Sequence, residues 1–214
     1  MFPLVVDLVD RRVVVIGAGQ VGVDKASEML RAGARVTIIT ETVRATIPAG
    51  VDEVIVRPYA YGDLIGALVV IAATGSGPVN DAIVAEANER NQLLNVVDDL
   101  ARSNFFFTAV HRDGDVIVSV STGGASPALA QWIRDAVARA LPRGLAGVAR
   151  QLRSERHVIH AEGQSTENRP WMARVQELIA AVPATDLRGD ADGPATVLAG
   201  TEPATQVEHQ PRTG

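Results

Sequence analysis

The sequence predicts an α/β fold in which a doubly wound parallel sheet is followed by a small α+β region and a C-terminal helical region. Two observations predict the sheet. Apolar runs of strand length alternate with helix-patterned segments from residue 13 to residue 97, which is the signature of a doubly wound sheet. The runs at residues 13–16 and 68–73 are continuously apolar, as expected of strands that are buried on both faces of a parallel sheet.

The first strand ends in a G-x-G-x-x-G motif formed by Gly17, Gly19 and Gly22. Gly17 permits the tight turn out of the strand, Gly19 lets the backbone approach a pyrophosphate, and Gly22 lets the next helix pack closely on the strand. That helix, patterned over residues 23–32, presents free N–H groups and its positive end to phosphates. This context predicts a Rossmann-like dinucleotide-binding domain, and the alternative is a structural glycine turn in another α/β protein.

An acid follows the second strand, which is expected at residues 35–40. Glu41 stands about 20 residues beyond the last glycine, where a carboxylate binds the ribose hydroxyls. A glutamate there favours NAD over NADP, because a 2′-phosphate would meet a negative charge. We therefore predict an NAD site whose contacts come from Gly17, Gly19, Gln20, Val21, Gly22, Glu41, Thr42 and Thr74.

The remaining strands of the sheet follow the same alternation. A third strand is expected at residues 53–57, and the fourth, at 68–73, ends at a Thr-Gly-Ser-Gly-Pro loop. A helix over residues 78–90 then leads to a fifth strand at 93–97, which ends at Asp98 and Asp99.

The pattern changes after Asp99. Runs at residues 105–110 and 116–121 flank an Asp-Gly turn and predict an antiparallel hairpin outside the sheet. Ser126 is a suitable N-cap for a helix over residues 127–141 that begins with proline. Further helices are expected at 145–156 and 171–182, and the aperiodic segment 183–214 is predicted to be a disordered tail.

The composition limits the classes of function. A net charge of −5 argues against a general nucleic-acid binder. No apolar run reaches the length of a membrane span, and the N-terminus lacks the basic region of a signal peptide. The absence of cysteine excludes disulfides, thiolate catalysis and thiolate metal ligands, so we expect a cytoplasmic protein. His157 and His160 have no third ligand nearby in the sequence, and we expect no permanent metal site.

Five sequence blocks occur in a characteristic order: Phe2-Pro3-Leu4, the glycine motif with Lys25-Ala26, Ala72-Ala73-Thr74, Asn95-Val96-Val97-Asp98, and Ser121-Thr122-Gly123-Gly124-Ala125-Ser126-Pro127. Together they resemble the precorrin-2 dehydrogenase/sirohydrochlorin ferrochelatase family, in the form of a stand-alone NAD-binding module of sirohaem synthase. The resemblance covers residues 2–155 and is more specific than any single block.

The resemblance implies oxidation of precorrin-2 to sirohydrochlorin with NAD⁺ and, in some members, insertion of Fe²⁺ as a substrate. It implies a homodimer, a catalytic role for Asp98, and a substrate region at Thr122. The loop formed by Thr122, Gly123, Gly124 and Ser126 precedes a helix N-terminus and could bind a substrate carboxylate, or could simply be a capped helix start. The excess of arginine over acid at residues 134–156 could attract a polyanionic tetrapyrrole or be a solvated helix face.

These inferences divide the chain into an NAD-binding domain (1–103), a hairpin region for dimerisation and substrate (104–126), a helical domain (127–182) and a tail (183–214).

Removal of a hydride from a reduced tetrapyrrole is accompanied by loss of a proton, for which Asp98 is a sensible general base. Asp98 lies at the carboxyl end of a strand, where ligand crevices open, although such a residue could also only cap a turn.

Two departures from the family pattern leave questions open. Asp24 stands where the family often has arginine, and Asp98-Asp99-Leu100-Ala101 stands where it often has a proline, so either Asp98 or Asp99 could be the working carboxylate. Two alternative functions also remain: a dehydrogenase without chelatase activity, and an NAD-sensing regulatory module. The second alternative accounts only for the segment from Gly17 to Glu41.

Overall fold

The computed structural model describes residues 1–167 and 169–182, which form two compact units. The first unit holds residues 1–112 and 117–140, and the second holds residues 113–116 and the described residues beyond 140. Within the described part of the chain, no helix combines the length and the apolar character needed to cross a membrane. The predicted tail, residues 183–214, lies outside the described residues.

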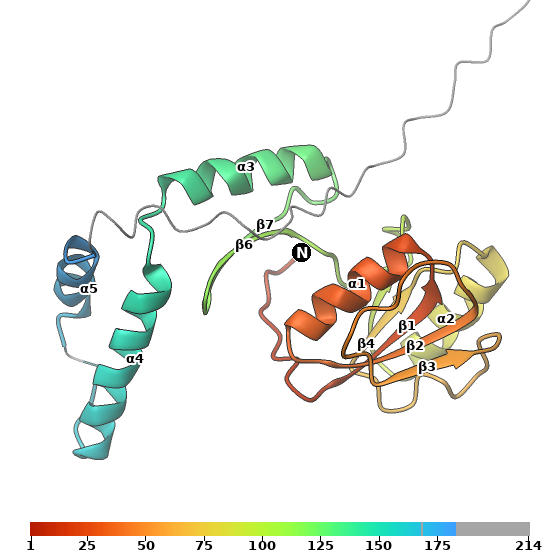
Figure 1. The fold of residues 1–214 in the computed structure, drawn as a ribbon, viewed down its shortest axis with the longest axis horizontal. Helices are drawn as coiled ribbons and strands as arrows, with labels where there is room; N and C mark the ends of the chain where they lie inside the picture. The colour runs from red at the N-terminus through yellow and green to blue at the C-terminus, as the bar shows by residue number, and fades with distance from the viewer. Residues whose placement is uncertain (168, 183–214) are drawn as a thin grey trace, which may run out of the picture. The chain divides into compact units, whose positions relative to one another are not determined.

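A five-stranded parallel sheet with the order β3-β2-β1-β4-β5 forms the centre of the first unit (Figure 1). This order is that of a doubly wound sheet, with the change of direction between β1 and β4. The predicted Rossmann-like fold is therefore confirmed. The strands are β1 (Arg12–Ala18), β2 (Arg35–Val43), β3 (Glu53–Val56), β4 (Val69–Ala72) and β5 (Leu93–Val96), and the helices are α1 (Gln20–Arg31) and α2 (Gly77–Glu89).

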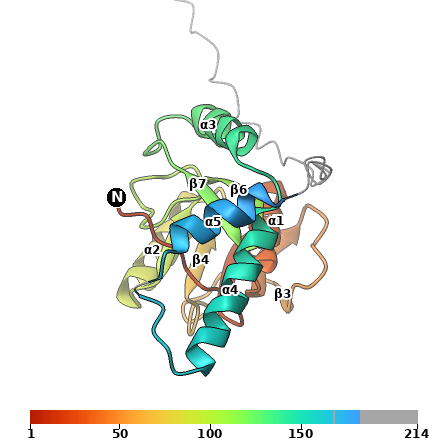
Figure 2. The ribbon, with the colours of Figure 1, turned by 90° about the vertical axis from the view of Figure 1, so that its left-hand side faces the viewer.

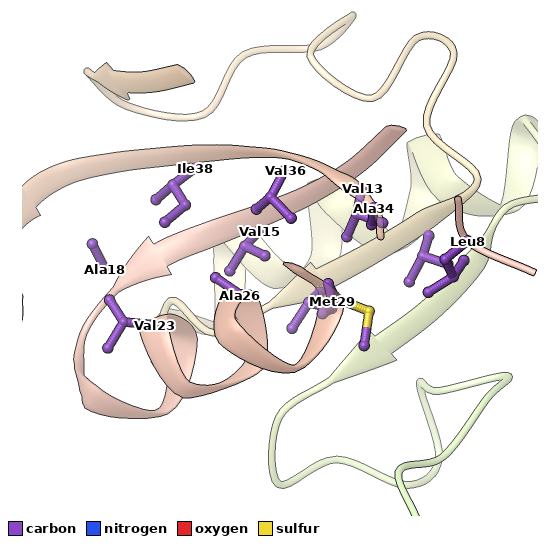
Figure 3. Close-up of a cluster of buried hydrophobic side chains, with 12 residues drawn as sticks. Leu8, Val13, Val15, Ala18, Val23, Ala26, Met29, Ala34, Val36 and Ile38 are labelled. Atoms are coloured by element: carbon purple, nitrogen blue, oxygen red, sulfur yellow. The ribbon is translucent and has the colours of Figure 1, made fainter. Parts of the chain in front are cut away.

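The core of this unit lies on both faces of the sheet, because successive strand residues point to opposite sides. Val13 and Val15 pack in the cluster that includes the apolar face of α1 (Figure 3). Val14 and Ile16 belong to the opposite cluster, which includes Ile83 of α2. All four β1 side chains are at most 2 % exposed, which explains why this strand is continuously apolar rather than alternating.

The segment after β5 forms a separate two-stranded sheet, β6 (Ala109–Asp113) and β7 (Val116–Val120), followed by α3 (Pro127–Ala140). The two-residue connection makes this pair an antiparallel hairpin, as predicted. The expected strand over residues 105–110 was wrong over its first four residues, because β6 begins at Ala109. Phe105 and Phe107 pack instead against the cluster on the α1 side of the sheet. Their rings contact each other at 5.4 Å between centroids.

The described residues of the second unit are mainly helical, with α4 (Leu145–Ala161) and α5 (Trp171–Ala180) packed on each other (Figure 2). Arg174 of α5 joins the helices through hydrogen bonds of 2.6 and 3.1 Å to the carboxylate of Glu155. Helix α4 continues five residues beyond its predicted end at residue 156.

Candidate active site

The predicted cofactor residues and Asp98 lie at or just beyond the carboxyl ends of four neighbouring strands. The glycine loop follows β1, Thr74 follows β4, and Asp98 follows β5, while Glu41 lies near the end of β2. Because the strands are parallel, these ends meet at one edge of the sheet. A β-carbon built on Gly17 would lie 3.3 Å from the backbone nitrogen of Thr74, so the loops after β1 and β4 are in direct contact.

The three motif glycines have different surroundings. Gly17 has a φ of +105°, and a β-carbon on it would lie 2.3 Å from the carbonyl oxygen of Ala73. A β-carbon on Gly22 would lie 2.1 Å from the carbonyl oxygen of Gly17. Nothing lies within 4 Å of a β-carbon on Gly19. Gly17 and Gly22 therefore permit close packing of the protein on itself, whereas Gly19 faces open space.

Helix α1 begins at Gln20, directly on the glycine motif and three residues earlier than expected. The amide of Val23 makes the first intrahelical bond, of 3.1 Å, to the carbonyl of Gly19. The N–H groups of residues 20–22 therefore have no intrahelical partner, and no acid lies in the first turn. This arrangement fits a dinucleotide pyrophosphate. The side chain of Gln20 is exposed and donates a hydrogen bond of 2.9 Å to Asp24.

Glu41 is exposed but lies within β2 rather than beyond its end, which corrects the expected strand boundary. The cause is a register shift after Ile16, which pairs Ala18 with Val43 and so prolongs the strand. The hydroxyl of Thr40 fixes this shift, since it accepts from the amide of Ala18 at 3.2 Å and donates to the carbonyl of Thr42 at 2.8 Å. Thr42 is exposed beside Glu41.

The hydroxyl of Thr74 is already used within its own loop. It accepts from the amide of Ser76 at 3.0 Å and lies 2.7 Å from the side-chain oxygen of the buried Asn80. Thr74 therefore shapes the loop after β4, and its contact with a cofactor stays a prediction.

The adjacent carboxylates Asp98 and Asp99 differ in their partners. Asp98 has a φ of +60° and an exposed side chain, and its carboxylate makes no hydrogen bond to any other described residue. The carboxylate of Asp99 accepts two hydrogen bonds from Arg102, one of 3.0 Å from its amide and one of 2.6 Å from its Nε. The Arg102 side chain, followed by its amide, holds the pKa of Asp99 below its ordinary value. Of the two, Asp98 is the carboxylate that is available to a ligand.

The predicted substrate loop is closed by its own hydroxyl groups. Thr122 Oγ1 accepts from the amide of Ser126 at 3.2 Å. Ser126 Oγ accepts from the amide of Leu129 at 3.2 Å and caps α3, as predicted. Gly123 and Gly124 are exposed and both have positive φ. A β-carbon on Gly124 would lie 2.7 Å from Leu100, so this loop contacts the loop that carries Asp98.

The sequence did not reveal how the segment after β5 is held. Asn104 takes the place of a neighbouring strand, because its side chain accepts from the amide of Leu94 at 2.7 Å and donates to the carbonyl of Gln92 at 2.8 Å. Arg102 Nη1 also donates to Asp81 of α2 at 2.6 Å. The i, i+3 spacing of Asp99 and Arg102 could have indicated their pairing, but no sequence signal points to Asp81.

Two family models match the chain in sequence. The family described as "NAD(P)-binding" covers residues 4–109, and the family described as "Sirohaem biosynthesis protein central" covers residues 113–140. The first match assigns a nicotinamide-cofactor site to the sheet domain. The second covers the hairpin turn, β7, the substrate loop and α3.

Similar proteins come from the same family. The chain is 35% identical to siroheme synthase 1 of Pectobacterium atrosepticum over 151 residues, which is 69% of this chain and 32% of that protein. It is 39% identical to siroheme synthase of Ectopseudomonas mendocina over 142 residues, 65% of this chain and 31% of that protein. The chain thus spans about a third of the length of these relatives.

The fold is also that of a solved structure. The precorrin-2 dehydrogenase SirC superposes with a TM-score of 0.62 and 23% identity, over 87% of this chain and 92% of that one. The sequence matches, the strand order and the glycine loop all indicate an NAD(P)-binding sheet domain. The chain therefore belongs to the family of sirohaem biosynthesis proteins, whose NAD(P)-binding and central modules it carries at residues 4–109 and 113–140.

Proposed function

We propose that this chain oxidises precorrin-2 to sirohydrochlorin with NAD⁺ as the acceptor, as a step in sirohaem biosynthesis. The observation that carries the proposal is the carboxylate of Asp98, which is exposed and has no partner among the described residues. It lies at the carboxyl edge of the sheet, two strands from the open glycine loop. The similarity to siroheme synthases supports the substrate class. The reaction balances as precorrin-2 + NAD⁺ → sirohydrochlorin + NADH + H⁺.

The glycine loop would hold the cofactor. The N–H groups of Gln20, Val21 and Gly22 would bind the pyrophosphate, and Gly19 would leave the space for it. Glu41 would bind the ribose hydroxyls, with Thr42 beside it, and we propose NAD rather than NADP because a 2′-phosphate would meet this carboxylate. When bound, NAD⁺ supplies the acceptor for the hydride that leaves the macrocycle.

Asp98 would accept the proton that is lost as the hydride leaves. Its carboxylate is suited to this task because it is exposed and accepts no hydrogen bond from a side chain of the described residues. The loop of Thr122, Gly123, Gly124 and Ser126 would bind a carboxylate of the tetrapyrrole, and its contact with Leu100 brings it to the Asp98 loop.

We propose that the same carboxylate serves a second step, in which Fe²⁺ enters sirohydrochlorin and two pyrrole protons leave. A homodimer, implied by the resemblance, and a cytoplasmic location, expected from the composition, complete the proposal. Sedimentation of the purified protein tests the dimer, since a single species at twice the chain mass is expected and a species at the chain mass would refute it.

Replacement of the two carboxylates tests the assignment of the base. Asp98→Asn is expected to lower kcat for NADH formation by about 10² to 10⁴ while NAD⁺ affinity stays unchanged. Asp99→Asn is expected to lower kcat by less, because that carboxylate accepts from Arg102 and would act only through the position of Asp98. Equal losses for both variants, or full activity of Asp98→Asn, would refute the assignment.

The same preparation separates the alternative functions. Addition of Fe²⁺ after oxidation should give sirohaem faster than the uncatalysed reaction, and Asp98→Asn should slow this step too. NADH formation without accelerated metal insertion would identify a dehydrogenase only. Binding of NAD⁺ without any turnover would favour the NAD-sensing module.

A further inference from the structure

Arg102 connects the loop that carries Asp98 to helix α2. Its Nε donates to Asp99 at 2.6 Å, its amide donates to the same carboxylate at 3.0 Å, and its Nη1 donates to Asp81 at 2.6 Å. Asp81 lies in α2, which is fixed on the sheet by the fully buried Ile83 and Ala87. One guanidinium therefore joins the loop after β5 to the helix that follows β4.

The same loop is closed at its base by Ser103. Its hydroxyl donates to the carbonyl of Asp99 at 2.7 Å and accepts from the amide of Val96 at 2.9 Å. The amide of Asp99 also donates to the carbonyl of Val96 at 3.1 Å. These bonds hold the residues on both sides of Asp98, whereas the Asp98 side chain itself has no partner among the described residues.

The backbone of Asp98 needs such support, because its φ of +60° lies in the left-handed region. A non-glycine residue keeps this conformation only where its surroundings determine it. The bonds of the neighbouring Asp99 provide the nearest constraint, and Arg102 provides two of them.

We propose that Arg102 is a positioning residue, which fixes Asp98 for proton transfer by holding Asp99 and Asp81 together. The inference rests on the proposed function, in which Asp98 is the general base. The planar guanidinium reaches both carboxylates at once through Nε and Nη1, and a lysine ammonium cannot reproduce this fork. Small misplacements of a catalytic group are costly, since about 1 Å can lower a rate about 10²-fold.

The test compares Arg102→Met, Arg102→Lys and Asp81→Asn with Arg57→Ala as the control. Arg57 makes a similar two-bond ion pair with Asp63, at 2.6 and 2.8 Å, away from the Asp98 loop. For each variant, kcat and KM for precorrin-2 oxidation, the dissociation constant of NAD⁺ and Tm are measured.

Arg102→Met is expected to lower kcat by about tenfold to 10²-fold, with the NAD⁺ dissociation constant and Tm matching the control. Arg102→Lys should recover part of kcat, because it keeps the charge. The double variant Arg102→Met/Asp81→Asn should be no slower than Arg102→Met, since both changes break one connection.

A kcat of Arg102→Met equal to that of Arg57→Ala would overturn the inference. A loss of NAD⁺ binding, or a Tm far below the control, would show that Arg102 supports the fold, and would overturn it as well. Full activity of Asp98→Asn would instead refute the general-base assignment, and this inference with it. Absence of NADH formation by the unmodified chain would refute the proposed function itself.

Discussion

The glycine motif provides a prediction that separates a ligand role from a packing role. Gly19 and Gly22 are three residues apart in one turn, yet their surroundings differ. A β-carbon built on Gly19 would have no atom within 4 Å, whereas a β-carbon built on Gly22 would lie 2.1 Å from the carbonyl oxygen of Gly17. Gly19→Ala should therefore impair cofactor binding without harming the fold. Gly22→Ala should harm the fold first.

The magnitudes follow from the local geometry. At the N-cap, alanine is less favourable than glycine by about 0.5–1 kcal/mol, but it also reduces the entropy of the unfolded chain by about 0.4–1 kcal/mol. The net change for Gly19→Ala should be within about 1 kcal/mol. For Gly22→Ala, the helix gains about 1 kcal/mol, but overpacking against backbone costs about 1–3 kcal/mol or more. The Gly17 backbone cannot retreat, because it is itself packed on Ala73.

Urea unfolding and NAD⁺ titration measure the two effects on the same samples. A methyl group on Gly19 would remove one charge-assisted hydrogen bond to the pyrophosphate, which contributes about 1.5–3 kcal/mol to binding. The dissociation constant of NAD⁺ should therefore rise about tenfold to hundredfold. Unchanged NAD⁺ affinity in Gly19→Ala, with normal stability, would refute the glycine loop as the pyrophosphate site. Normal stability of Gly22→Ala would refute the packing argument.

Three further predictions concern other parts of the first unit. Burial alone would raise the pKa of Glu86, but hydrogen bonds from Tyr59, the Gly62 amide and Arg90 hold this pKa below its usual value of 4.5. The ionised Glu86 should therefore stabilise the fold above pH 4.5, and this contribution should be lost as the pH falls through the folded-state pKa. Glu86→Gln should lower the unfolding free energy by about 2–4 kcal/mol and flatten this acid dependence, and a wild-type profile would contradict the network. Lys25 is the single lysine; it is 6% exposed, and its Nζ lies 3.7 Å from the centre of the Phe107 ring. Mass spectrometry should show that an amine reagent labels only the N-terminus until the protein unfolds. Rapid labelling of Lys25 in the native protein would contradict its burial. Glu41→Gln should reduce the preference for NAD⁺ over NADP⁺ by about tenfold, and an unchanged ratio in paired titrations would exclude Glu41 from the ribose site.

The sheet could be predicted because its local signals agree with its burial. Residues such as Val13 and Val14 lie on opposite faces, and both faces are covered, so the continuous apolar run leaves no other simple arrangement. The prediction of a strand from residue 105 was wrong because short apolar runs are ambiguous. An extended core segment and a strand can have the same composition. Only the tertiary contacts of Phe105 and Phe107 distinguish them.

The cofactor part of the candidate site rests on sequence patterns that stay predictions. The glycine motif and Glu41 follow from what a dinucleotide needs at fixed spacing. By contrast, Arg102 and Asp81 are 21 residues apart, and their contact depends on how α2 lies beside the loop after β5. Asp98 and Asp99 are adjacent residues of the same type, so the sequence alone does not distinguish them, whereas the bonds from Arg102 to Asp99 do.

The most direct test of the central claim is the anaerobic reaction of the purified chain with enzymatically generated precorrin-2 and NAD⁺. The absorbance of NADH and of sirohydrochlorin is followed in one cuvette, with Asp98→Asn as the matched control. The account predicts one NADH for each sirohydrochlorin, at a rate that is proportional to protein and largely lost in the variant. Tight NAD⁺ binding with no NADH above the protein-free rate would contradict it.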